Sequence, residues 1–250
     1  MAETPIILAK NIWLNASANP DYEHDDFPAY RISDGNRGSK WESTQSGTQK
    51  VDFVVPDDDV IEVNAFVLDR GFVLTGATVV IKGSANAGFT LSVVTVATLN
   101  NPDPEKIHLV IFETPATKKY WRIEITGVTA TPIIFNAGIF PEIDLGVNPV
   151  SPFDPQRKIM TIEKFESGGG TDQIQVRREK REVRADYPRM SDALYGKIIQ
   201  AFDGAGDNPV WWFFRPVSET HDGVYGFIES ERDFPIVNNM RDGEIRIVEA

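Results

Sequence analysis

Oxygen-bearing side chains gather in one short stretch of the sequence, AYRISDGNRGSKWES at residues 29–43. Asp34, Asn36 and Ser39 fall within a single turn of this stretch, and Trp41 follows as a large apolar anchor. Carboxylate, amide and hydroxyl oxygens held close together are the ligands that Ca²⁺ requires. The same residue types also form turns in which Asp and Asn side chains accept hydrogen bonds from their own backbone. The residues alone leave both interpretations open, a calcium loop and a self-capped turn.

Patterns typical of catalysis do not occur in the sequence. The histidines His24, His108 and His221 stand in unrelated contexts without an HExxH pair, and no serine lies in a GxSxG motif. The chain has no cysteine, so it has neither a thiol nucleophile nor a thiolate metal site nor a disulfide. The acidic run at 57–59 is typical of a solubilising turn rather than of a spaced acid–base pair. We therefore predict a protein that is not an enzyme.

The composition is that of a folded globular chain, with 41% hydrophobic and 25% charged residues in a length of 250. The net charge of −12 argues against nucleic-acid binding, which depends on Lys and Arg neutralising phosphates. The longest apolar runs, 77–81 and 209–214, are much shorter than the roughly 20 residues needed to cross a bilayer, so we expect no membrane insertion. The first residues lack the basic region of a signal peptide, and we expect none.

Strand patterns dominate the first 145 residues, where runs rich in Val, Ile, Phe and Thr alternate with turns rich in Pro, Gly, Asn and Asp. The predicted strands are 52–56, 60–69, 77–85, 89–94, 108–114 and 120–128. Short strands at such regular spacing predict a sandwich or jelly roll.

The segment GVNPVSPFDP at 146–155 contains three prolines and is the predicted boundary between two domains, 1–146 and 156–250. Beyond it the pattern changes to strands around one helix at 191–203, with Ser191 and Asp192 able to cap its start and Gly204 to end it. The predicted strands here are 157–166, 173–185, 209–217, 223–231 and 244–250. The fold class is therefore mainly β, an N-terminal jelly-roll β-sandwich followed by a smaller β-rich α+β domain with one helix.

Four segments resemble the discoidin-type (galactose-binding-like) jelly-roll family: ASAN at 16–19, YRISDGNRGSKWES at 30–43, KKYWRIEITG at 118–127 and FPEIDLG at 140–146. The resemblance implies a structural Ca²⁺ held by Asp34, Asn36, Ser39 and Glu142 together with backbone carbonyls. The family more often has Thr where Ser39 stands. It also implies sugar or lipid binding by loops near 22–26 and 70–74.

The order of elements in residues 156–250 is similar to the ring-forming domain of bacteriophage distal-tail and baseplate proteins. The similarity lies in one helix, the aromatic run at 211–214, then GVYGFI and a closing EIRIVEA. It implies a virion structural protein at the tail tip, a homo-oligomer in a hexameric ring that contacts other tail proteins. The N-terminal module would then meet a cell-surface glycan. The same residues also suit an ordinary α+β core. The alternative functions are a stand-alone extracellular carbohydrate-binding or adhesion protein and an accessory domain of a glycoside hydrolase.

The predicted strand 173–185 carries a cluster of basic residues interrupted by Glu179 and Glu182. It is either a solvated strand face or a docking patch. We predict that this strand lies at or near a contact between subunits. In a closed ring, Arg178, Arg181 and Arg184 would meet complementary charges on the next subunit and fix its register.

Overall fold

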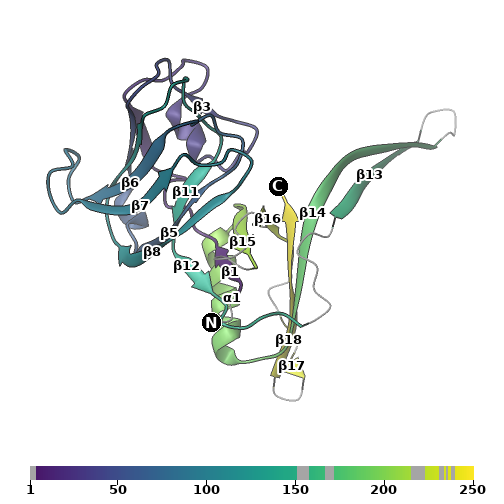
Figure 1. The fold of residues 1–250 in the computed structure, drawn as a ribbon. Helices are drawn as coiled ribbons and strands as arrows, with labels where there is room; N and C mark the ends of the chain where they lie inside the picture. Colours follow the sequence, from purple (N-terminus) through teal and green to yellow (C-terminus); the bar gives the residue numbers. More distant parts are fainter. Residues whose placement is uncertain are drawn as a thin grey trace. The chain divides into compact units, whose positions relative to one another are not determined.

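The computed structural model describes residues 4–150, 158–166, 172–214, 223–230, 234, 236–237 and 240–250. It divides the chain into two compact units. One unit is Leu8–Glu142, and the other combines Met1–Ile7 with Ile143–Ala250. Both consist mainly of antiparallel strands, and the described helical structure is one α-helix and two short 3-10 helices (Figure 1). The predicted fold class is thereby confirmed. None of the helices within the described ranges has the length and apolar character needed to cross a membrane.

The Leu8–Glu142 unit is a sandwich of a five-stranded sheet, ordered β2-β4-β9-β6-β7, and a three-stranded sheet, ordered β11-β5-β8, with a small β10–β3 pair beside them. Its strands are β2 (Ser17–Pro20), β3 (Trp41–Glu42), β4 (Gln49–Val54), β5 (Val63–Leu68), β6 (Thr78–Ser84), β7 (Val94–Asn100), β8 (His108–Ala116), β9 (Tyr120–Thr126), β10 (Ile133–Ile134) and β11 (Ala137–Phe140). The 3-10 helices are η1 (Ala29–Ile32) and η2 (Asp57–Asp59).

Alternation along the strands builds the sandwich core. In β4 and β9 every second side chain is buried, as expected of strands with one face turned inward. The core between the sheets is rich in aromatic rings, and Trp13 stacks on Phe53 with 4.2 Å between ring centroids. Trp41 and Trp121 are fully buried in the same cluster. Large apolar rings of this kind supply much of the burial that stabilises such a unit.

The prediction of a strand at 89–94 is wrong. That segment is a loop, and the strand β7 begins only at Val94. The side chain of Asn86 fixes the loop, because its Oδ1 accepts hydrogen bonds from the backbone N–H groups of Thr90 and Leu91 at 3.1 and 3.0 Å. Phe89 and Ser92 adopt positive φ angles of 51° and 47°, which a strand does not allow.

The second unit is built on a sheet ordered β12-β1-β15-β16-β18-β14-β13, with β17 paired to β18. Its strands are β1 (Ile6–Leu8), β12 (Glu142–Asp144), β13 (Lys158–Glu166), β14 (Asp172–Met190), β15 (Val210–Phe213), β16 (Val224–Ile228), β17 (Ile236–Val237) and β18 (Met240–Glu249). This grouping differs from the predicted domain 1–146, because β1 and β12 join the sheet of the C-terminal residues. A backbone hydrogen bond of 3.0 Å from the Leu145 N–H to the Pro5 carbonyl joins the residue after β12 to the residue before β1.

The helix α1 spans Asp192–Ala205. The Ser191 hydroxyl caps its start by accepting from the Leu194 N–H at 3.2 Å, as its sequence predicts. The helix runs past the predicted end at 203, because the residue that ends it is Gly206, with φ at 54°, rather than Gly204. Ile198 and Phe202 lie on its buried face, and the Phe202 ring lies near Phe234.

The long strand β14 changes partner halfway. Residues 172–181 pair with β13, and residues 182–190 pair with β18, which lies on the other side of β14 in the sheet order. Figure 1 shows the hairpin of β13 and β14 extending beyond the end of β18. The tip of the hairpin, and the side chains of 158–179, lie outside the described residues.

Candidate functional site

The loop that follows β2, residues 21–28, is held in place by backbone hydrogen bonds to two strands. Asp21 N–H donates to the Lys50 carbonyl of β4 at 2.9 Å. His24 N–H donates to the Glu42 carbonyl of β3 at 2.9 Å, and Glu42 N–H donates back to the Phe27 carbonyl at 3.2 Å. The loop predicted to bind a ligand at 22–26 is therefore fixed in shape before any ligand arrives.

Two tyrosines, one in this loop and one in the η1 helix that follows it, are exposed. Tyr22 is 43% exposed and Tyr30, on η1, is 55% exposed. A partly covered pair lies next to them in the chain, with the rings of His24 and Phe27 5.1 Å apart. The Lys40 ammonium lies 4.2 Å from the centre of the Phe27 ring and also bonds Glu42 at 2.6 Å. Exposed rings beside charged groups are typical of surfaces that bind amphipathic ligands.

Acidic residues precede and follow Tyr22 in the chain. Asp21, Glu23, Asp25 and Asp26 are all exposed. Glu23 also has a structural role, because its Oε2 accepts a hydrogen bond from the Ala29 N–H at 2.8 Å. The loop therefore offers free carboxylate oxygens that can accept hydrogen bonds from a ligand's hydroxyl groups.

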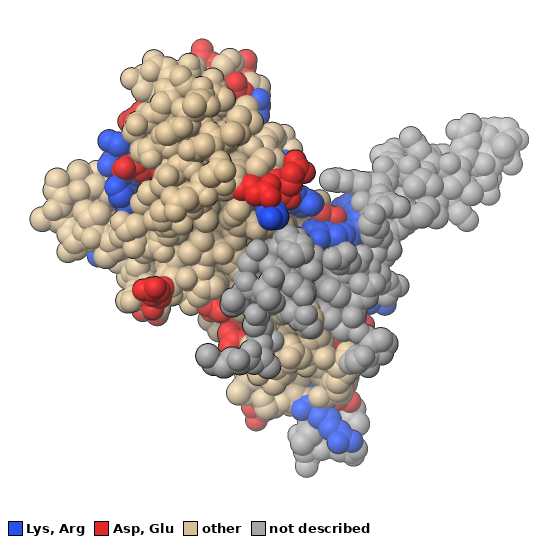
Figure 2. All heavy atoms as spheres, in the orientation of Figure 1, with Lys and Arg blue, Asp and Glu red and all other residues tan. Residues whose placement is uncertain are grey.

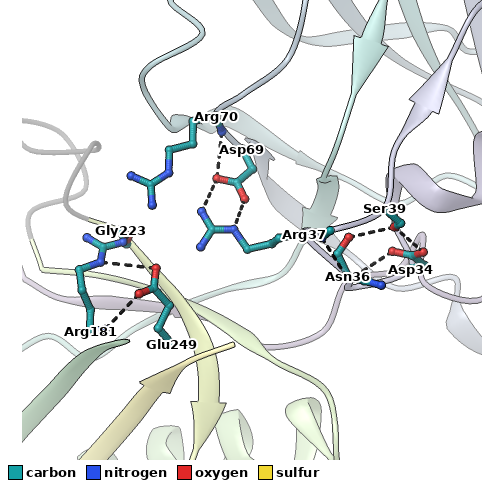
Figure 3. A network of polar contacts seen from close by, with 10 residues as sticks. Asp34, Asn36, Arg37, Ser39, Asp69, Arg70, Arg181, Gly223 and Glu249 are labelled. Atoms are coloured by element: carbon teal, nitrogen blue, oxygen red, sulfur yellow. Dashed lines mark hydrogen bonds and ion pairs between the residues drawn. The ribbon is translucent and has the colours of Figure 1, made fainter. Parts of the chain in front are cut away.

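Three of the four predicted calcium ligands lie together (Figure 3). Asp34 accepts from the Ser39 hydroxyl at 2.7 Å and from the Asn36 N–H at 2.8 Å. The Ser39 hydroxyl oxygen also lies 2.9 Å from the Asn36 carbonyl oxygen, and the Asn36 side chain accepts from the Gly38 N–H at 2.9 Å. This is the self-capped turn that the residue types allow. It also brings an Asp34 carboxylate oxygen and the Asn36 carbonyl oxygen each within 3 Å of the Ser39 hydroxyl oxygen, and these are oxygen types that bind Ca²⁺.

The fourth predicted ligand, Glu142, lies on β12, and its carboxylate accepts from the Asn64 amide of β5 at 3.0 Å. The Glu142 N–H in turn donates to the Asn64 side-chain oxygen at 2.6 Å. Within the described part of the chain there is no group of three or more His, Asp or Glu residues that could hold a metal. A Ca²⁺ here would depend on hydroxyl and carbonyl oxygens around Asp34, and calcium binding stays a prediction.

A buried ion pair that the sequence does not reveal anchors the same turn (Figure 3). Arg37 donates through two nitrogens to the Asp69 carboxylate, at 2.5 and 2.9 Å, and Asp69 also accepts from the Arg70 N–H at 2.9 Å. The Asp69 side chain is 2% exposed and that of Arg37 20% exposed. In the sequence, Asp69 is notable only because it ends an apolar strand run, and this position does not indicate which residue pairs with it.

The second predicted ligand loop, 70–74, is largely part of the core. Phe72 and Leu74 are buried in the hydrophobic cluster of the sandwich. Val73 is bonded through its backbone to Ile133. Only Arg70 and Gly71 are exposed.

The other candidates for chemistry have structural partners. In the acidic run 57–59, which forms η2, Asp57 bonds Lys119 at 2.5 Å and Asp59 bonds Lys10 at 2.9 Å. The hydrogen bond from Lys10 lowers the pKa of Asp59. His108 lies on β8 with its Nε2 2.9 Å from the Asp103 carbonyl, and His221 lies outside the described residues.

The arginines predicted to meet a neighbouring subunit already have partners in their own chain. Arg181 donates to the Gly223 carbonyl at 2.9 Å and lies 3.7 Å from the Glu249 carboxylate (Figure 3). Arg184 lies 3.1 Å from Glu182. The folded sheet thus supplies counter-charges for both side chains, and their contact with a neighbouring subunit stays a prediction. The side chain of Arg178 lies outside the described residues.

Glu182 is the centre of this charge cluster. Its side chain is 0% exposed and also accepts from the Arg246 guanidinium at 2.5 Å. Burial by itself would raise the pKa of Glu182, but the hydrogen bonds from Arg246 and Arg184 outweigh burial and hold the pKa below its usual value.

No protein-family model and no curated protein sequence matches the chain. Solved structures do match. A selenomethionine-labelled V110M mutant of chitosan-binding module 1, from a chitosanase/glucanase of Paenibacillus sp. IK-5, is 22% identical. The match covers 53% of this chain and 98% of that one, with a TM-score of 0.46.

Two modules of Clostridium perfringens are also similar, each 16% identical with a TM-score of 0.45. One, a family 32 carbohydrate-binding module, was solved with galactose, and the match covers 54% of this chain and 98% of the module. The other was solved with GalNAc-beta-1,3-galactose, and the match covers 53% of this chain and 99% of the module.

Proposed function

We propose that this chain is a non-catalytic, glycan-binding structural component of a bacteriophage tail tip or baseplate. In this proposal the Leu8–Glu142 unit binds a cell-surface glycan, and the other unit forms contacts between copies and with other tail proteins. The chain would then work in the virion, after synthesis in the host cytoplasm.

The exposed tyrosines carry the glycan part of the proposal. A sugar ring has an apolar C–H face and a rim of hydroxyl groups, so it needs a flat apolar surface with hydrogen-bonding groups beside it. Tyr22 and Tyr30 supply the rings, and the exposed carboxylates of Asp21, Glu23 and Asp25 supply the acceptors. The backbone bonds that hold the loop to β3 and β4 lower the cost of ordering it on binding.

The length of β14 supports the assembly part. Within the described ranges, its first half pairs only with β13, so the edge of residues 172–181 opposite β13 has no strand partner. A strand edge with free N–H and C=O groups can pair with a neighbouring chain. Contacts of this kind, repeated by rotation, close into a ring.

Glycan binding is tested with the full chain on a glycan array, followed by calorimetry with the glycans that bind. Replacing Tyr22 and Tyr30 together by Ala should reduce affinity at least tenfold, because about 1.4 kcal/mol corresponds to a factor of ten. Leu91→Ala is the matched control, since Leu91 is similarly exposed and lies outside the loop. Equal binding by the double variant and the parent would contradict the assigned site.

Assembly is measured separately, by size-exclusion chromatography with light scattering. We expect a closed ring, with six copies as the specific expectation. A monomer that still binds glycan would favour the alternative, a stand-alone carbohydrate-binding or adhesion protein. A ring that binds no glycan would support only the assembly part of the proposal.

A further inference from the structure

A groove opens between β7 and β8, the outermost strands of the two sheets of the sandwich. It is lined by Val94–Thr98 and Val110–Ala116, and its volume is about 540 Å³. This volume is within the size range of ligand sites, roughly 300–1,000 Å³. The groove belongs to different strands from the tyrosine loop of the proposed glycan site.

Bulges in both edge strands accompany the groove. In β7, Val96 is an extra residue, because Ala97 and Thr95 face consecutive residues of β6. In β8, four residues from Phe112 to Pro115 stand opposite the single Asn64 of β5. Bulges bend a strand and redirect its side chains, and they are common beside binding sites. The opening between the sheets therefore has a local structural cause.

The lining has an apolar floor and a nearly uncharged rim. Ala97, Phe112 and Ala116 are buried, Val94 and Val110 are partly buried, and Ile111 is exposed. The rim carries threonine hydroxyls and one charged side chain, Glu113, which is exposed and has no ion-pair partner among the described residues. Figure 2 shows few charged atoms on the face of the unit where β7 and β8 lie in Figure 1.

We propose that this groove binds an extended, cationic peptide segment of a partner protein. No other strand pairs with the outer edge of β7 or of β8 within the described residues, so both edges offer N–H and C=O groups to an added strand. Alternate side chains of that strand would enter the apolar floor, and a Lys or Arg beside Glu113 would supply the missing counter-charge.

Charge and ring chemistry favour this occupant over a second copy of the chain or a glycan. A second copy would bring the same net charge of −12 and another Glu113, which lacks an ion-pair partner in the part of the chain that the structure describes. A glycan would find no exposed aromatic face, because Phe112 is the only ring in the lining and is buried. A cationic peptide, a second copy and a glycan should therefore give different results in binding experiments.

The test measures binding of a fluorescein-labelled peptide, Thr-Val-Lys-Val-Thr-Val-Lys, to the full chain by fluorescence anisotropy. The matched probe has Glu in place of both Lys residues. We expect the Lys probe to bind more tightly and to protect backbone amides of β7 and β8 from hydrogen exchange. Glu113→Lys should weaken the Lys probe about fivefold to tenfold and strengthen the Glu probe. Glu105→Lys is the control, an exposed carboxylate outside the lining.

A second variant, Ile111→Asp, tests the apolar part of the lining without changing Glu113, and should weaken both probes. Three results would overturn the proposal. One is that neither probe binds at millimolar concentration. Another is that both probes bind with equal affinity and that Glu113→Lys changes neither affinity. The third is concentration-dependent self-association of the parent that Ile111→Asp abolishes, which would assign the groove to a second copy.

Discussion

Removing the charge of Asp69 should destabilise the sandwich far more than removing an exposed charge. Asp69→Asn keeps the shape of the side chain and its bond to the Arg70 N–H, but removes the charge that faces the Arg37 guanidinium at this buried position. Breaking a buried ion pair typically costs about 3–5 kcal/mol. Because Arg37 is 20% exposed and can partly hydrate, we expect the lower end, about 3 kcal/mol. In a domain of this size the melting temperature should fall by roughly 10 °C.

The assay must report on the sandwich rather than on the whole chain, because each unit has its own core. Hydrogen exchange of the β9 segment, Tyr120–Thr126, followed against urea concentration gives the unfolding free energy of that unit. Asp57→Asn is the matched control. It removes the same charge from an ion pair of the same 2.5 Å length, but Asp57 is 81% exposed, so the cost should be about 0–1 kcal/mol.

A compensating double variant completes the test. Replacing the pair by Arg37→Met with Asp69→Leu should recover most of the lost stability, because apolar residues of similar volume need no counter-charge. Equal costs for Asp69→Asn and Asp57→Asn would refute the reasoning, since burial would then have no effect on the strength of the pair.

Three further predictions concern calcium, acid and the helix start. If Ca²⁺ binds the Asp34 turn, its addition should raise the melting temperature by mass action and Asp34→Asn should abolish the rise; equal temperatures with calcium and chelator would leave only the self-capped turn. The pKa of Glu182 is lower in the folded than in the unfolded chain, so its charge stabilises the unit at a pH above the unfolded pKa of about 4.3. The free energy of unfolding should therefore fall as the pH drops through the folded pKa. In urea titrations, Glu182→Gln should remove this part of the acid dependence. Ser191→Ala should cost about 1 kcal/mol in the unfolding free energy of the same unit, whereas Ser191→Gly, which the N-cap position tolerates, should cost only a few tenths of that.

Local patterns predicted the elements whose residues determine their own structure. Alternation specifies β9, and the capping hydroxyl of Ser191 specifies the start of α1. The same reasoning failed at 89–94, where apolar residues suggested a strand. The deciding interaction there is the Asn86 side chain, which holds the loop through hydrogen bonds that an apolar count does not register.

Non-local pairings could not be predicted in the same way. Nothing in the residues of β1 shows that they join a sheet with the C-terminal strands. Asp69 and Arg37 are 32 positions apart, and neither lies in a pattern that names the other. The Asp34 turn was predicted because its partners are neighbours in sequence, whereas the position of Glu142 against Asn64 depends on the pairing of distant strands.

The charges of β14 change how a ring could be held together. Arg181 and Arg184 are neutralised within the chain, so reversing them to Glu would place acid beside Glu249 and the buried Glu182 and destabilise the monomer. Such a variant could not separate folding from assembly. The backbone edge of residues 172–181 remains as the means of contact, because pairing through N–H and C=O groups does not depend on these side chains. Assembly through this edge should therefore depend less on salt than assembly through ion pairs. Light scattering at low and high salt distinguishes these two kinds of contact. Rings that dissociate at high salt would show that charged side chains, rather than the backbone edge, hold the subunits together.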